Sequence, residues 1–338
     1  MKIILAPDSF KECLTAAQVA RAMAQAVLEA CPSAQVIRMP LADGGEGTLE
    51  VLVEALGGVQ QEVTVSDPLG RPVPARLGVA GDTAIIEVAQ ACGLSLLTPE
   101  ERRPLEASSR GVGELLMAAY RRGCRHFLIG LGGTATCDGG AGMLVVPGVK
   151  ALKDITVELL CDVEAPFIGP QGAARVFAPQ KGASPEDVEV LEERMMALAA
   201  RMQAETGVDV RYIPGAGAAG GLGGAFLAYC GARKVSGIGR MLDLLRFSET
   251  VKGASLILTG EGRSDSQTLQ GKAPFGVLQH AGNVPVALVS GRIEDRAELE
   301  AAGFRPVVEV TPRNIPLSEA LQAKTALQNI CTAVKSLF

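Results

Sequence analysis

The sequence predicts an α/β protein built on a parallel sheet with helices on both faces. Short continuous apolar runs, typical of strands buried on both sides, alternate with amphipathic helical patterns at both ends of the chain. Glycine, with 40 of 338 residues, gathers in loops that follow these runs. A length of 338 residues also suggests two domains, at roughly 150 residues per domain.

The N-terminal part predicts two strand–helix units. Residues 3–6 form an apolar run, and a helix then begins at Thr15, where Thr15 and Gln18 make a capping box. Residues 36–41 predict the second strand. The glycine-rich turn ADGGEGT then leads into a helix that ends at the glycine pair 57–58.

The C-terminal third repeats this alternation, which again favours a parallel sheet. We expect strands at residues 256–259, 286–290 and 307–310, a polar loop at 260–271, and helices after Pro274, over 295–302 and over 318–336.

The middle of the chain differs, with short strands and turns at 61–87. A helix over 111–122, a strand over 126–129 and a long helix capped by Ser184 follow. We therefore predict one discontinuous α/β domain, formed by residues 1–58 and 250–338, with a second α/β domain inserted at 59–249.

Composition excludes several function classes. With 32 basic and 37 acidic residues, the chain lacks the basic excess of a nucleic-acid-binding protein. His126 and His280 are the only histidines, too few for a three-histidine zinc site. The eight cysteines form no CxxC pair, and no apolar run nears the ~20 residues that span a membrane. We expect a cytoplasmic protein with reduced thiols and a small-molecule substrate.

Five loops at predicted strand ends combine glycine, acids and cations. Glycine lets backbone N–H groups approach a phosphate, lysine and arginine neutralise it, and carboxylates hold Mg²⁺ or accept a hydroxyl proton. This inventory is typical of phosphoryl transfer. Because histidine is scarce, the base should be a carboxylate. The loops read PDSFKE from Pro7, ADGGEGT from Ala42, LGGTATCDGGAG from Leu131, FAPQKGA from Phe177 and TGEGRSDSQTLQGKAP from Thr259.

Two nucleotide motifs carry less weight. Residues 215–220 match GxGxxG, with Asp243 further on, but they lie in the inserted region and not at the first strand–helix turn. Gly271-Lys272 lacks the upstream glycine of a Walker A motif.

In this order, the segments APDSFKE, ADGGEGT, GGTAT with DGGAGML, CDV, PQKGA, PGAGAAGGLG and TGEGR with GKAP resemble the bacterial glycerate kinase family over nearly the whole chain. The resemblance implies ATP- and Mg²⁺-dependent phosphorylation of D-glycerate to 2-phosphoglycerate, with 3-phosphoglycerate not excluded. It also implies a flavodoxin-like (Rossmann-like) three-layer domain with a second α/β domain inserted, and an active site in the cleft between them. The oligomeric state stays open, a homodimer being one option.

We expect Lys11, Asp43, Asp265 and Arg263 to be catalytic. Asp43, Glu46 and Asp162 are the candidate metal ligands. The expected substrate- and phosphate-binding residues are Asp8, Ser9, Gly44, Gly45, Glu46, Gly132, Gly133, Thr134, Asp138, Lys181, Gly260, Glu261, Gly262 and Lys272.

The chain departs from the family pattern at several positions. Thr134 and Cys137 stand where the family usually has Ser and Asn, and Glu164-Ala165 replaces Asp-Asn. Residues 143–157 form a segment roughly thirty residues shorter than usual, which indicates either a deletion or an unlisted loop. Two other functions stay open: an NAD-linked oxidoreductase of a small hydroxy acid, motivated by residues 215–220, and a non-catalytic metabolite-binding relative, motivated by Cys137 and Ala165.

Overall fold

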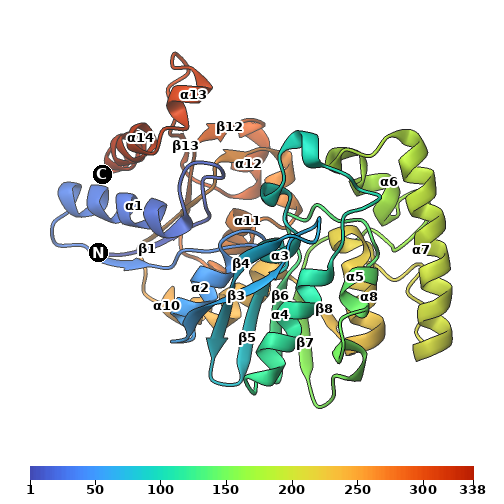
Figure 1. Cartoon of the computed structure of the whole chain (residues 1–338). Helices are drawn as coiled ribbons and strands as arrows, with labels where there is room; N and C mark the ends of the chain where they lie inside the picture. Colours follow the sequence, from blue (N-terminus) through green and yellow to red (C-terminus); the bar gives the residue numbers. More distant parts are fainter. The chain divides into compact units, whose positions relative to one another are not determined.

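A computed structural model describes residues 1–338 and divides them into two compact units (Figure 1). Unit 1 comprises residues 1–43 and 238–338, and unit 2 comprises residues 44–237. Each unit has its own hydrophobic core. No helix is long and apolar enough to cross a membrane.

Unit 1 is built on a five-stranded sheet whose neighbouring strands are all parallel. Numbered along this unit, the strands lie in the order 2-1-3-4-5, which is the flavodoxin-like order. The expected fold class is therefore confirmed. In sheet order the strands are β2 (Gln35–Arg38), β1 (Lys2–Pro7), β9 (Leu256–Gly260), β11 (Val286–Ser290) and β13 (Val307–Glu309).

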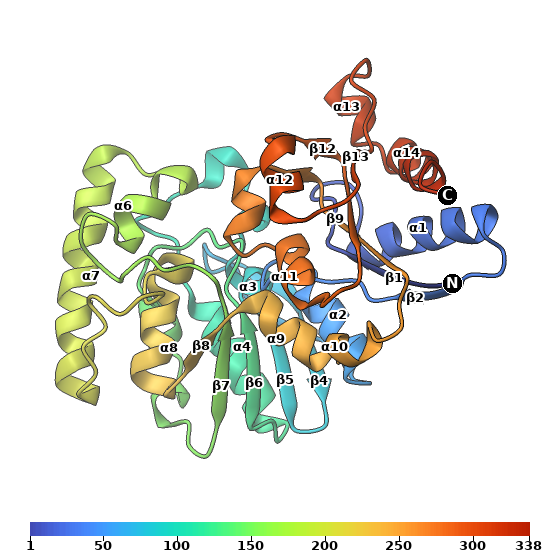
Figure 2. The ribbon, with the colours of Figure 1, turned by 180° about the vertical axis from the view of Figure 1, so that it is seen from behind.

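Helices cover both faces of this sheet. Ile3 and Leu5 point into the core that α1 (Ala16–Ala30) and α14 (Ala323–Lys335) complete. Ile4 points to the other face because side chains alternate along a strand, and α11 (Ala273–His280) contacts β1, β9 and β11. Figure 2 shows these layers from behind. The shorter helices of unit 1 are α9 (Gly237–Leu244, whose first residue belongs to unit 2), α10 (Phe247–Thr250), α12 (Arg296–Ala302) and α13 (Leu317–Ala320).

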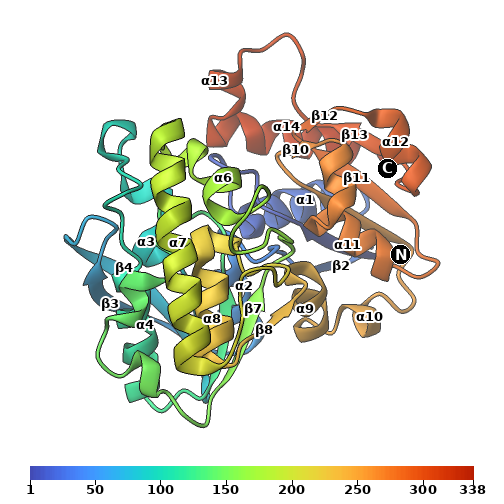
Figure 3. The ribbon, with the colours of Figure 1, turned by 90° about the vertical axis from the view of Figure 1, so that its right-hand side faces the viewer.

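Unit 2 contains a six-stranded mixed sheet in the order β3-β4-β5-β6-β7-β8. The first three strands pair antiparallel, and β5 to β8 pair parallel. The long helix α7 lies beside α8, as Figure 3 shows. The strands are Val59–Ser66, Pro72–Ala80, Thr83–Glu87, His126–Gly130, Thr156–Leu160 and Arg233–Val235, and the helices α2 to α8 are Thr48–Ala55, Ala89–Cys92, Arg110–Arg121, Ala141–Leu144, Ala173–Phe177, Pro185–Thr206 and Leu222–Cys230.

Some element boundaries differ from the expected ones. The second strand ends at Arg38, although the N–H groups of Met39 and Leu41 still donate to the carbonyls of Leu5 and Pro7, at 2.7 and 2.9 Å. The expected helix over 318–336 is divided into α13 and α14. Helix α2 packs on β3, β4 and β5, and the N–H of Leu49 donates to Glu87 at 2.8 Å. These contacts place residues 44–58 in unit 2, not with the first sheet.

Candidate functional site

The first candidate site lies at the carboxyl ends of β1 and β9 in unit 1. Pro7 and Gly260 are paired across these two strands, and the N–H of Asp8 donates to the carbonyl of Gly260 at 2.8 Å. In a sheet of this order, β1 and β9 flank the point where the strand connections change direction. Ligands bind in the crevice outside that point. The loops that begin at Asp8 and Glu261 are thus brought together where a ligand is expected.

Asp8 is the most perturbed acid of this site. Burial, reinforced by the negative charges of Asp43 and Glu261, raises its pKa to about 8. A hydrogen bond from the Ser9 N–H, at 2.6 Å, and the positive charge of Lys11 act in the opposite direction. The site therefore concentrates negative charge that a bound cation would neutralise.

Glu261 organises the following loop. Its buried carboxylate accepts hydrogen bonds from the hydroxyls of Ser264 (3.1 Å) and Thr268 (2.7 Å). Burial raises its pKa, while these two hydroxyls and Lys272 lower it. A structural role as the centre of this loop follows from these contacts.

Lys272 and Arg263, the cations of the loop that begins at Glu261, each lie close to two acids. Lys272 Nζ lies 3.5 Å from Glu261 and 3.8 Å from Asp265. Arg263 lies 2.7 Å from Glu294 and 3.6 Å from Asp265. Both keep unused N–H donors, because each acid occupies only part of an ammonium or guanidinium group.

Lys11 and Asp43 are two charged residues of unit 1 whose side chains are unengaged. No hydrogen bond or salt bridge occupies the side chain of either residue. Asp43 nevertheless lies close enough to raise the pKa of Asp8. A free ammonium and a free carboxylate beside a crevice are available for substrate.

A cavity of about 640 Å³ opens here, and it contains more than the sequence predicted. Asp8, Ser9, Lys11 and the loop residues line its charged end. Arg292 was not among the predicted residues, although it follows β11 and the same strand-end rule predicts it. The cavity also has an apolar end, which no chemical signal in the sequence indicates. That end is lined by Val310, Leu317, Ala320, Leu321 and Ala326.

The histidines take no part in this cavity. His126 faces Asp82 at 3.4 Å, and Nδ1 of His280 contacts the carbonyl of Gly276 at 2.8 Å. Neither lines the cavity.

The glycines predicted to shape phosphate contacts pack closely within unit 2. A Cβ on Gly44 would lie 2.4 Å from the carbonyl oxygen of Leu160, and one on Gly132 would lie 2.8 Å from the Cα of Gly45. Both positions therefore need glycine for backbone packing. Their predicted phosphate contacts, and that of the exposed Gly133, stay predictions.

Lys181 is buried beside the loop that begins at Leu131. Its ammonium donates to the hydroxyl of Thr134 at 3.0 Å and to the carbonyl of Thr136 at 2.7 Å. Burial lowers its pKa. Lysine has three donors, so one remains for a ligand. Thr134 keeps the hydroxyl that the family usually places there.

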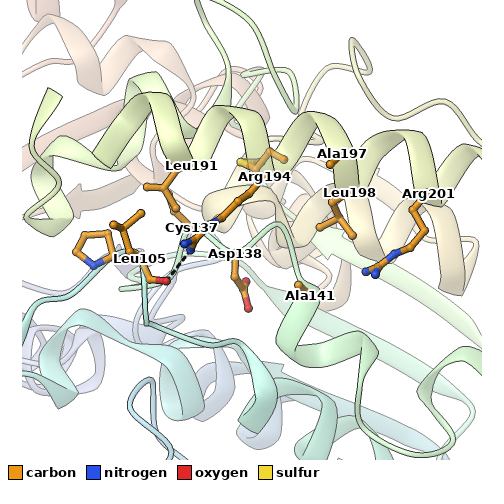
Figure 4. A pocket seen from close by; sticks show the side chains of 11 residues that line it. Leu105, Cys137, Asp138, Ala141, Leu191, Arg194, Ala197, Leu198 and Arg201 are labelled. Atoms are coloured by element: carbon orange, nitrogen blue, oxygen red, sulfur yellow. Dashed lines mark hydrogen bonds between the residues drawn. The ribbon is translucent and has the colours of Figure 1, made fainter. Parts of the chain in front are cut away.

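Asp138 anchors the loop. Its carboxylate accepts from the N–H and hydroxyl of Ser109, both at 2.8 Å, and from the N–H groups of Gly140 and Gly142, both at 3.0 Å. Three of these donors meet Oδ2 and one meets Oδ1, so the carboxylate is held in place by the surrounding backbone and by Ser109. Asp138 also lines a separate cavity of about 400 Å³ under α7, where Arg194 donates to the carbonyl of Leu105 (Figure 4).

The GxGxxG segment is a packing motif. A Cβ on Gly217 would lie 2.2 Å from the carbonyl oxygen of Pro166, and one on Gly220 would lie 2.0 Å from that of Thr136. The backbone thus fills the space that a dinucleotide would need. Glu164 and Ala165, which replace the usual Asp-Asn pair of the family, both make contacts within unit 2. Glu164 forms an ion pair with Lys234, and the carbonyl of Ala165 accepts a hydrogen bond from the N–H of Gly217 at 2.9 Å.

The acids show how well the site fits Mg²⁺. No group of three or more His, Cys, Asp or Glu side chains converges to hold a metal ion. Mg²⁺ in kinases, however, needs only one or two carboxylates besides the phosphates. Asp8, with Asp43 near it, meets that need. Glu46 has no hydrogen-bond partner, and Asp162 accepts from the N–H of Gly237 at 3.2 Å.

Comparison with known proteins covers the full length of the chain. The sequence model of the Glycerate kinase family matches residues 3–153 and 147–338. The chain is 39% identical to the Glycerate 2-kinase of Escherichia coli (strain K12), covering 100% of this chain and 97% of the relative. It is 40% identical to the Glycerate kinase of Bacillus subtilis (strain 168), covering 95% and 93%. The crystal structure of the "putative glycerate kinase 2" from Salmonella typhimurium LT2 has a TM-score of 0.86 at 40% identity, covering 100% of this chain and 97% of that chain. The chain therefore belongs to the glycerate kinase family of enzymes.

Proposed function

We propose that this protein transfers the γ-phosphoryl group of ATP to the 2-hydroxyl of D-glycerate, with Mg²⁺, and releases 2-phosphoglycerate. The observation that carries the proposal is the unit 1 cavity, which Lys11 and the buried Asp8 line, with the carboxylate of Asp43 close enough to act on Asp8. The Escherichia coli relative, a Glycerate 2-kinase by name, supports the position of transfer.

The cations would neutralise the charge of the reactants. Lys11 has no competing acid in contact, so it is available to the transferred phosphoryl group or to the substrate carboxylate. Arg263 and Lys272 are held by the acids of their own loop and supply further positive charge. Phosphoryl transfer depends mainly on such positioning and charge stabilisation.

Asp43 is the carboxylate that would accept the proton of the 2-hydroxyl. Both histidines are engaged away from the cavity, and Glu261 is already bonded by two hydroxyls. Asp8 would be the main protein ligand of the Mg²⁺ that accompanies ATP. When bound, that ion would neutralise phosphate charge.

A coupled assay of ADP release tests the reaction with glycerate, lactate and tartronate as acceptors. We expect turnover with D-glycerate, its loss on addition of EDTA, and its return with excess Mg²⁺. NMR of the product then separates 2-phosphoglycerate from 3-phosphoglycerate. Tight binding of glycerate without ADP release would instead identify a non-catalytic relative.

A further inference from the structure

The unit 1 cavity has two chemically different ends, and the proposed reaction uses only one of them. Its charged end carries Lys11, Arg263 and Lys272, whereas its other end is lined by Val310, α13 and the first turn of α14. Cavities of roughly 300–1,000 Å³ hold ligands much larger than a three-carbon acid. At about 640 Å³, this cavity has room for a second and larger reactant.

Two leucine side chains at the apolar end of the cavity are exposed. Leu317 is 63% exposed and Leu321 is 36% exposed, although both line the cavity beside the buried Ala320. Exposed apolar side chains that continue a charged cavity are typical of a ligand-binding surface. An occupant that fits both ends combines an apolar part with an anionic part, and the acids Asp8 and Glu261 would hold a cation that accompanies it.

We infer that the nucleoside of ATP binds in unit 1, with its base against Leu317, Leu321 and Val310 and its phosphates toward Lys11, Arg263 and Lys272. The inference rests on the proposed use of ATP. Gln267 supports it, because this residue lines the same cavity and its side-chain amide has no hydrogen-bond partner. An amide offers both a donor and an acceptor, which matches the edge of adenine.

The cavity of unit 2 is the competing location, and its chemistry fits a nucleotide less well. Leu191 and Leu198 make it largely apolar (Figure 4), together with Met195. Arg194 donates to the carbonyl of Leu105. The carboxylate of Asp138 accepts from four donors and would repel a phosphate.

Binding of a fluorescent ADP analogue to the full chain decides between the two cavities. Leu317→Asp and Leu321→Asp place a carboxylate beside the base, and we expect each to raise the Kd by about tenfold or more. Leu28→Asp is the matched control, because Leu28 is a 44% exposed leucine of unit 1 that does not line the cavity. Ala197→Trp fills the unit 2 cavity and should leave the Kd unchanged.

The outcomes separate this inference from the proposed function. An unchanged Kd in both leucine variants would overturn it, and a Kd raised only by Ala197→Trp would place the nucleotide in unit 2. Failure of the wild-type chain to bind the analogue would remove ATP as the donor, and the inference with it. Binding that depends on the leucines, without turnover of glycerate, would keep the nucleotide site and reject the proposed acceptor.

Discussion

Asp43 and Lys11 differ from most charged residues of the chain in having no partner. Charged residues that stabilise the fold have hydrogen-bond partners: Glu261 accepts from two hydroxyls, and Asp138 accepts from four donors. An unengaged pair beside a cavity contributes little to stability, so its charges are available for binding and transfer.

We expect Asp43→Asn and Lys11→Ala each to lower kcat/KM by ~10² or more, since each removes a charge that acts on the reacting groups. Thermal stability should stay close to that of the wild type. Steady-state kinetics and a melting curve for each variant measure the two effects. The site assignment is wrong if both variants keep near-normal turnover.

Glycines with the same backbone conformation differ in what surrounds them. Gly220 and Gly57 have φ of 65° and 64°, and both belong to unit 2. A Cβ on Gly220 would meet the Thr136 carbonyl at 2.0 Å, whereas nothing lies within 4 Å of one on Gly57. The pair therefore separates conformational strain from close packing.

Gly57→Ala should cost about 1–2 kcal/mol through the left-handed backbone alone. Gly220→Ala should cost about 1–3 kcal/mol more, because the Thr136 backbone must move. In a unit of this size, each kcal/mol lowers Tm by about 2–4 °C. Equal melting temperatures for the two variants would show that the backbone at Thr136 moves aside without a cost in stability.

At the scale of elements, helix α7 is the best-specified part of unit 2. Ser184 accepts from the N–H of Asp187 at 3.1 Å, and Asp187 accepts from the N–H of Ser184 at 3.0 Å. Pro185 occupies the first turn, where no N–H is needed. The capping residues define where the helix begins, which is why the sequence predicted its start correctly.

Ser184→Ala should lower the stability of unit 2 by about 1 kcal/mol through loss of this cap. Ser184→Asp should restore most of the loss, because aspartate is an equally good N-cap. Ser95→Ala serves as the control, since Ser95 is an exposed serine of the same unit without a side-chain hydrogen bond. Thermal unfolding followed by circular dichroism measures all three, and a Ser184→Ala curve matching that of Ser95→Ala would contradict the expectation.

At the scale of the whole molecule, the sequence predicted the parallel sheet and the loops at its strand ends. Strand-end loops meet because parallel strands share an edge, so Asp8 and Glu261 could be placed together in advance. The unit boundary could not, because α2 joins unit 2 through packing on β3, β4 and β5 that no local pattern encodes. The apolar end of the cavity was missed for the same reason: Leu317 resembles any surface leucine until its neighbours are known.

The comparisons with relatives also bear on the short segment between α5 and β7. The alignment with the Escherichia coli relative spans 371 positions, more than the 338 residues of this chain. The family model matches in two pieces that meet at 147–153, within the segment 143–157. Both observations agree with a segment that is shorter than in the relatives. A real deletion predicts an intact mass near 35.0 kDa, whereas a loop absent from the printed sequence predicts a larger mass.

Unit 2 is continuous in sequence and closes its own core, whereas unit 1 is formed from two segments. The core of unit 2 runs from Val65 to Ala232 and takes no residue from unit 1. A fragment of residues 44–237 should therefore fold alone and unfold cooperatively. All three tyrosines of the chain (Tyr120, Tyr212 and Tyr229) lie in this fragment, and the chain has no tryptophan.

The near-UV circular dichroism of tyrosine consequently reports on unit 2 in both the fragment and the full chain. We expect the two spectra to agree in the tyrosine region, because Tyr120 and Tyr229 pack against the core of unit 2. Phe127→Ala, which empties a fully buried core position, should destabilise the fragment by about 3–5 kcal/mol. A fragment with helical far-UV signal but no near-UV signal would be a molten globule, and unit 2 would then depend on unit 1 for its packing.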